Sequence, residues 1–114
     1  MFTLPNGAKR GPDASWIPNS RWDRFTADEK ESLTKICPDF VIDLRSKSDR
    51  IAKIKEKMAE YMANGARLGW LLDPRENCAT IYRPGRPPQL IEEPAILSGD
   101  PVLPGFKFDF REIL

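Results

Sequence analysis

The run from Pro38 to Ser46 constrains the fold most, because it places a carboxylate inside an otherwise apolar, strand-like stretch. Side chains alternate along an extended strand, so Val41 and Asp43 face the side opposite to Phe40. Burying the charge of Asp43 is unfavourable unless the carboxylate is paired with a cation or holds a metal ion. The run therefore predicts a strand whose acidic side chain has a structural or a chemical task.

The composition excludes several kinds of catalytic site. The chain has 114 residues, of which 40% are hydrophobic and 31% are charged, as is ordinary for one soluble globular domain. It has no histidine, so a histidine general base and a Ser-His or Cys-His nucleophile are excluded. Cys37 and Cys78 lack the spacing of zinc ligands. Any metal site would therefore rest on carboxylate oxygens.

The sequence shows no feature of a membrane or secreted protein. No apolar run approaches the ~20 residues of a membrane helix, and the first residues carry no secretion signal. Two lone cysteines in such a chain are typical of reduced thiols. We therefore expect a cytoplasmic protein that does not enter a membrane.

The net charge of +1 does not by itself predict a nucleic-acid partner. Binding to nucleic acid would have to come from local basic patches, each of which could equally be a solvated face. The candidate patches are Lys9-Arg10, the group Lys53, Lys55 and Lys57, and the pair Arg83 and Arg86.

Turn signals and apolar spacing predict a mixed order of strands and helices. In chain order we expect a hairpin with strands at 2–4 and 8–17, a short polar surface helix within 22–35, a strand at 40–44, a long helix at 50–63, strands at 68–72 and 78–82, a short strand near 89–91, and a final alternation of Phe106, Phe108 and Phe110. The boundary signals are a tight turn at Asn6-Gly7, a bend at Pro12, a capping box from Thr26 to Glu29, and a helix cap at Ser48 or Asp49. This order predicts an α/β fold in which one long helix packs on a central mixed β-sheet.

The long helix offers two lysines to the sheet. Its apolar stripe at helical spacing is formed by Ile51, Ile54, Met58, Tyr61 and Met62. Lys55 and Lys57 lie on opposite flanks of this stripe, and either could extend over the sheet. The spacing alone does not choose between them.

Strand geometry decides which acids can act together. Asp39 and Asp43 share a face but lie four residues apart, roughly 13 Å, so one metal ion cannot be held by both. We expect Asp39 to be a turn or hydrogen-bonding residue, and Asp43 to need a partner from another strand, for which Asp13 is the natural candidate. Arg45, about 7 Å further along the same face, could pair with Asp43 or contact phosphate.

Two strand carboxylates and a nearby lysine are the groups that metal-assisted phosphodiester cleavage needs. The acids hold Mg²⁺, and the cation stabilises charge or positions the attacking water. Arg45 would be a poor substitute for the lysine, because a guanidinium is planar and is not readily deprotonated.

Several segments, in order and at matching spacing, resemble the Uma family of restriction-endonuclease-like proteins. They are Leu4-Pro5-Asn6-Gly7-Ala8, Pro12-Asp13-Ala14-Ser15-Trp16, Cys37-Pro38-Asp39-Phe40-Val41-Ile42-Asp43-Leu44-Arg45-Ser46, Lys57-Met58-Ala59-Glu60-Tyr61, Asn64-Gly65-Ala66-Arg67-Leu68-Gly69-Trp70-Leu71-Leu72-Asp73-Pro74, Ile81-Tyr82-Arg83-Pro84-Gly85 and Leu97-Ser98-Gly99-Asp100. The resemblance implies one restriction-endonuclease-like domain over residues 1–114 and Mg²⁺-dependent DNA cleavage. It also implies Asp13 and Asp43 as metal ligands and Lys57 as the catalytic lysine.

The sequence departs from the family pattern in three ways. The family usually has Glu at the position of Asp43 and Pro at that of Lys47, and its members usually begin before the position of Met1. We therefore expect the family's N-terminal segment to be missing and apolar surface to be exposed, which favours a homodimer. Two alternatives remain open: an inactive relative that serves as a packing or dimerisation module, and a nucleic-acid binder that does not cleave.

Overall fold

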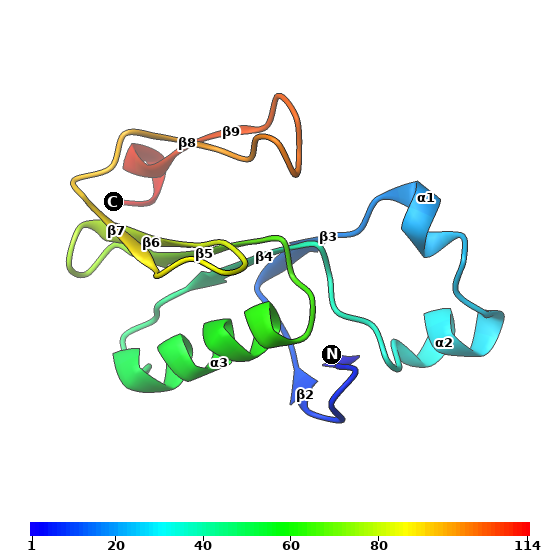
Figure 1. Ribbon diagram of the computed structural model, residues 1–114. Coiled ribbons are helices and arrows are strands. Elements are labelled where there is room, and N and C mark those ends of the chain that lie inside the picture. Colours follow the sequence, from blue (N-terminus) through cyan, green and yellow to red (C-terminus); the bar gives the residue numbers. More distant parts are fainter.

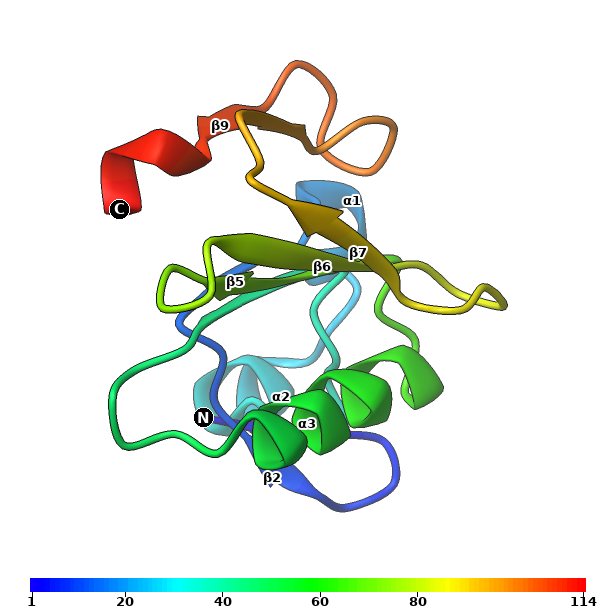
Figure 2. The ribbon, with the colours of Figure 1, turned by 90° about the vertical axis from the view of Figure 1, so that its left-hand side faces the viewer.

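The computed structural model describes residues 1–114 and is built on one five-stranded mixed sheet in the order β3-β4-β5-β6-β7. The strands are β3 (Ala14–Trp16), β4 (Phe40–Leu44), β5 (Leu68–Asp73), β6 (Cys78–Tyr82) and β7 (Gln89–Glu92). The pair β4 and β5 is parallel, and every other neighbouring pair is antiparallel. Figure 1 and Figure 2 show the sheet between two layers, with the long helix below it and a small hairpin above it. The predicted α/β fold with a mixed sheet is confirmed.

The long helix is α3 (Ile51–Ala63), the only helix of the structure that exceeds six residues. It forms the crossover between β4 and β5, because two parallel strands cannot be joined by a tight turn. All six residues of β5 are buried, which confirms its predicted central place. The register sets Phe40 opposite Leu68 and Leu44 opposite Leu72, so the sheet has two distinct ends along these strands.

The predicted apolar stripe of α3 packs on the sheet. Ile54, Met58 and Tyr61 are buried, and they form one core with residues such as Val41 from the facing strands. A Cβ at position 69 would lie only 2.8 Å from Met58 Cε, so glycine at this position lets the helix lie close to β5.

The predicted helix cap is wrong. Helix α3 begins after Arg50, which makes no capping hydrogen bond through its side chain. The Asp49 carboxylate instead accepts hydrogen bonds from the backbone N–H and hydroxyl of Ser46, because it closes the turn that precedes the helix.

The opposite face of the sheet is covered by strands β8 (Ile96–Ser98) and β9 (Lys107–Asp109), followed by a 3₁₀ helix over Phe110–Ile113. Trp70 is fully buried beneath this layer and stacks on Phe106 with the ring centroids 5.8 Å apart. The predicted Phe106–Phe110 alternation is thus only partly a strand, and its partner β8 was not anticipated.

The N-terminal segment forms a hairpin of its own, with strands β1 (Phe2–Thr3) and β2 (Lys9–Arg10). Its turn lies at Asn6-Gly7 as predicted, with Gly7 in the left-handed region. The strand expected over 8–17 is divided in two: the chain bends near Pro12, as that residue predicted, and continues as β3 in the main sheet.

Two short helices, α1 (Asn19–Trp22) and α2 (Ala27–Ser32), connect β3 to β4 and bury no residue. The predicted capping box between Thr26 and Glu29 is present. No helix of the structure has the length and apolar character needed to cross a membrane.

Candidate active site

Asp43 lies near the end of β4, on the face that α3 covers, and only 4% of it is exposed. Its Oδ1 accepts hydrogen bonds from Lys57 Nζ at 3.2 Å and from the Asp13 backbone N–H at 3.3 Å. Its Oδ2 is buried and has no hydrogen-bond partner. A buried carboxylate oxygen is almost always paired, and the protein itself supplies no partner for this one.

Lys57 reaches Asp43 from the middle of α3. Its ammonium also donates to the Gly11 carbonyl at 2.7 Å, so two contacts fix the charge between the helix and the bend before β3. Lys55 lies on the exposed flank of the helix, away from this site. The structure therefore makes the choice that helical spacing left open.

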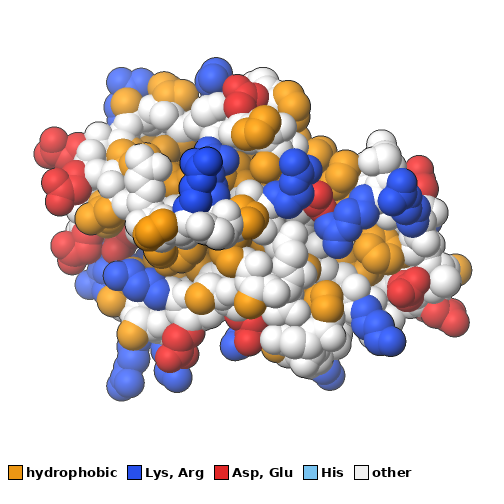
Figure 3. Space-filling model, viewed as in Figure 1, with side chains coloured by type: hydrophobic (Ala, Val, Ile, Leu, Met, Phe, Trp, Pro, Cys, Tyr) orange, Lys and Arg blue, Asp and Glu red, His pale blue; other side chains and the backbone are white.

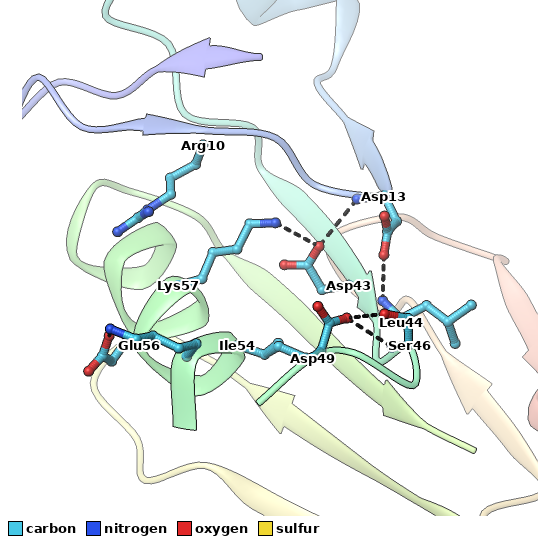
Figure 4. Close-up of a pocket in the computed structure, with 10 residues that line it drawn as sticks. Arg10, Asp13, Asp43, Leu44, Ser46, Asp49, Ile54, Glu56 and Lys57 are labelled. Carbon is cyan, nitrogen blue, oxygen red and sulfur yellow. Dashed lines mark hydrogen bonds and ion pairs between the residues drawn. The ribbon is translucent and has the colours of Figure 1, made fainter. Parts of the chain in front are cut away.

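Asp13 enters the site from the segment just before β3. Its backbone N–H donates to Ile42 O at 3.0 Å as well as to Asp43, and its Oδ2 accepts from the Leu44 N–H at 2.7 Å. The structure thus brings together all three of Asp13, Asp43 and Lys57, which come from three different elements (Figure 4).

These side chains line a pocket of about 470 Å³ that is mostly polar. The lining residues are Arg10, Asp13, Asp43, Leu44, Ser46, Asp49, Lys53, Ile54, Glu56 and Lys57. In Figure 4 the side chain of Lys57 points toward Asp13 and Asp43, while Glu56 points away from them. The pocket therefore offers both carboxylate oxygens and cationic side chains, with Lys57 in direct contact with Asp43.

The sequence interpretation missed how Arg10 and Glu60 take part. Arg10, noted only as part of a basic patch, lines the pocket and donates from Nε to Glu60 at 2.7 Å. Glu60 lies three residues after Lys57, a spacing at which helical side chains are neighbours. That spacing was the one available signal for Glu60.

Burial raises the pKa of Asp43 above its usual value, and the neighbouring Lys57 ammonium only partly offsets this effect. The protein alone therefore stabilises the Asp43 carboxylate incompletely. A second cation beside Oδ2 would favour the charged form further.

The donor set fits Mg²⁺ better than metals that need a closed cage. The structure contains no group of three or more histidine, cysteine or acidic side chains that could hold a metal. Mg²⁺ is usually bound by one or two carboxylates and keeps several waters. The orphan Oδ2 of Asp43 beside Asp13 in an open polar pocket matches that requirement.

Two other residues considered from the sequence lie outside the pocket. Asp39, at the far end of β4, accepts from Arg21, which confirms the expected hydrogen-bonding role. Arg45 donates to Asp73 at 2.8 Å, so its suggested pairing with Asp43 is wrong. Asp73 competes successfully because it lies on the neighbouring strand β5 and is itself buried.

The fold and this site define a nuclease-like α/β protein, and comparison with known proteins agrees. The chain matches the Uma2 family, described as "Putative restriction endonuclease", over residues 1–111. It belongs to this family.

A solved structure has the same fold. It is described as a "putative nuclease belonging to DUF820" from Anabaena variabilis, with a TM-score of 0.72 and 22% sequence identity. The match covers 90% of this chain and 57% of the Anabaena protein, so the chain spans little more than half of that protein's length. Curated proteins include no match.

Proposed function

We propose that this protein is a Mg²⁺-dependent DNA endonuclease whose site is formed by Asp13, Asp43 and Lys57. The buried, unpartnered Oδ2 of Asp43 is the observation that carries the proposal, because the residue lies beside a second carboxylate and a lysine in one pocket. Membership in a family described as restriction endonucleases supports DNA as the substrate.

Asp43 Oδ2 and the Asp13 carboxylate would hold the metal ion. When bound, Mg²⁺ supplies Lewis-acid polarisation of a phosphoryl oxygen and lowers the pKa of a coordinated water. Asp13 has one oxygen engaged by the Leu44 N–H, which fixes the direction of its carboxylate before any ligand arrives. Such orientation by a neighbouring donor is what makes a carboxylate ligand effective.

Lys57 would bind the phosphate and hold the attacking water. Two of its three N–H donors bond to Asp43 and Gly11 O, which leaves one donor of this pocket-lining residue for a ligand. The contact with Asp43 would keep this ammonium in place as negative charge develops on the phosphate. Positioned charge of this kind acts without reorganisation during the reaction.

The test is nicking of supercoiled plasmid DNA in Mg²⁺ and in a chelator. We expect Mg²⁺-dependent nicking that falls about a thousandfold in Asp43→Asn, since metal stabilisation of the transition state contributes several kcal/mol. Lys57→Ala should be similarly impaired, and its matched control Lys55→Ala should retain activity. Nicking that persists in chelator or in Asp43→Asn would refute the site, and DNA retention without nicking would favour a non-cleaving binder.

We also propose that two copies of the chain associate. An apolar groove of about 200 Å³ is lined by Ala14, Ser15, Trp16, Phe40, Ile42, Leu103 and Phe106. It adjoins β3, which is an edge strand of the sheet and therefore has one unpaired side. These features support a second copy packed against this edge.

Light scattering tests the dimer. A mass of twice 13.0 kDa is expected, and Ser15→Lys should lower it to that of a monomer while Ser20→Lys should not. A monomer at high concentration would contradict the proposal.

We propose in addition that the protein is cytoplasmic. The free thiols of Cys37 and Cys78 support this location.

A further inference from the structure

Three arginines meet at the end of the sheet away from the active-site pocket. Arg67, Arg83 and Arg86 line a second open pocket of about 550 Å³, together with Pro84, Pro101 and Val102. They come from the connection between α3 and β5 and from the loop between β6 and β7. No acidic side chain lines this pocket.

These arginines keep most of their hydrogen-bonding capacity free. Arg83 and Arg86 make no ion pair or hydrogen bond through their side chains. Arg67 approaches Asp39 only to 4.0 Å, and 58% of its side chain is exposed. Arg21 is the closer partner of Asp39. A guanidinium has five donors, so the cluster presents many unused N–H groups to solvent.

Charge is separated along the sheet. Arg67 directly precedes β5 and Arg83 directly follows its antiparallel neighbour β6, so both lie at one end. Another pocket, beside the β5–β6 turn, is lined by Glu76, Glu92 and Glu93. In Figure 3 basic side chains stand in the middle of this face and a group of acidic ones lies at its left edge, while others of both signs are scattered around the rim. The chain thus has a basic region at Arg67, Arg83 and Arg86 although its net charge is only +1.

The cluster is separate from the Asp43 pocket. Asp43 lies opposite Leu71 of β5. Leu71 is three residues, about 10 Å along the strand, from Leu68, which follows Arg67 directly. The two pockets share no lining residue. A ligand in one would leave the other accessible.

We propose that Arg67, Arg83 and Arg86 form a second binding site, for the phosphodiester backbone of nucleic acid. The identity of that ligand as DNA rests on the proposed function. Arginine forks bind phosphate oxygens in pairs, and contacts of this kind position a nucleic acid without reading its sequence. Pro84, Pro87 and Pro88 restrict the loop that carries two of the arginines, so less freedom is lost on binding.

The experiment measures binding in chelator, where cleavage is absent. A fluorescein-labelled 20-base-pair duplex is titrated with the wild-type protein and with Arg83→Ala/Arg86→Ala at 50, 100 and 200 mM salt. Each lost phosphate contact should reduce the slope of log K against log salt by about 0.9. The double variant should therefore show a slope smaller by about 1.8, and lose about twelvefold less affinity over this salt range.

A matched control removes the same charge elsewhere. Lys35→Ala/Lys55→Ala eliminates two exposed lysines that line neither pocket, and it should keep the wild-type slope. Arg83→Lys/Arg86→Lys keeps the charge but not the fork, so it should keep the slope and bind more weakly. Melting temperatures of all variants should stay near wild type, because the substituted side chains make no ion pair in the fold.

The outcomes separate this inference from the proposed function. Three results would overturn the second site. They are the same slope in Arg83→Ala/Arg86→Ala as in the wild type, a decrease in slope in the lysine control equal to that of the arginine variant, and no DNA binding by the wild type. Arginine-dependent binding by a protein that never nicks DNA would refute the endonuclease while supporting the second site.

Discussion

Asp39, just before β4, and Asp43, within β4, are two buried carboxylates whose surroundings differ. Each is 4% exposed. Asp39 accepts from Arg21 with one oxygen and has Arg67 at 4.0 Å from the other. Asp43 has Lys57 and the Asp13 N–H on one oxygen, and nothing on the other.

This difference separates a structural acid from a functional one. The protein supplies a cation to each side of Asp39, so its charge is balanced when the chain folds. Asp43 receives a cation on one side only, and it borders an open polar pocket. Burial or residue type alone would not have distinguished the two, whereas the number of carboxylate oxygens with a cation within 4.0 Å does, since it is two for Asp39 and one for Asp43.

The largest expected effect comes from burying a third acid, this time with no cation beside it, between α3 and the sheet. Met58 is fully buried between α3 and the sheet, so Met58→Asp should destabilise the fold by about 4–5 kcal/mol. Chemical denaturation gives this value, and Met58→Leu, which keeps the volume, should lose less than about 1.5 kcal/mol. An unchanged melting temperature in Met58→Asp would mean that the helix does not pack here.

The next effect tests whether Asp39 depends on its cation more than Asp43 does. Arg21→Met leaves Asp39 buried with only the distant Arg67, and should lower the free energy of unfolding by about 3 kcal/mol. Lys57→Met should lower it by only about 1 kcal/mol, because Asp43 faces the pocket and its raised pKa lets it take up a proton more easily. Urea unfolding measures the free energy of unfolding of both variants. Equal decreases in Arg21→Met and Lys57→Met would contradict the comparison.

Much of the fold could be predicted because local signals agree with the packing. The alternation at 40–44, the stripe of α3 and the apolar run of β5 each match the face that the structure buries. The cap of α3 and the strand at 8–17 differ from expectation for two reasons. The Asp49 side chain is used by the local turn with Ser46, which competes with capping. The bend at Gly11 is held by a tertiary contact, since its carbonyl accepts a hydrogen bond from Lys57 on α3.

The site was harder to predict than the fold. Strand spacing excluded a metal shared by Asp39 and Asp43, and it suggested Asp13 as the partner of Asp43. It could not tell Lys55 from Lys57, nor anticipate that Asp73 would take Arg45. Those outcomes depend on how α3 and β5 are placed against β4, which no short segment specifies.

Mg²⁺ should stabilise the protein through Asp43 and not through Asp39. At ten times its dissociation constant, a ligand that binds only the folded state adds about 1.4 kcal/mol. A thermal melt in Mg²⁺ should show this gain in the wild type and in Lys55→Ala, and no gain in Asp43→Asn. A gain that survives in Asp43→Asn would place the ion elsewhere.

The smallest effect concerns solvent access to the end of the sheet where Asp39 lies, before β4. Cys37, next to this end, is fully buried, and burial raises the pKa of its thiol from 9.0 to about 11. The folded state therefore holds the thiol proton more tightly than the unfolded state does. Stability from this source is complete below pH 9 and is lost as the pH rises through about 11.

Thiol labelling and unfolding at several pH values measure this effect. Cys78, which is partly exposed, should react with a thiol reagent at pH 8 while Cys37 stays unmodified until the protein unfolds. The decline in stability between pH 9 and 11 should be shallower in Cys37→Ala, whatever that substitution does to stability at neutral pH. Rapid labelling of Cys37 in the native protein would show that the Asp39 end is open, and the contrast with the Asp43 pocket would then be lost.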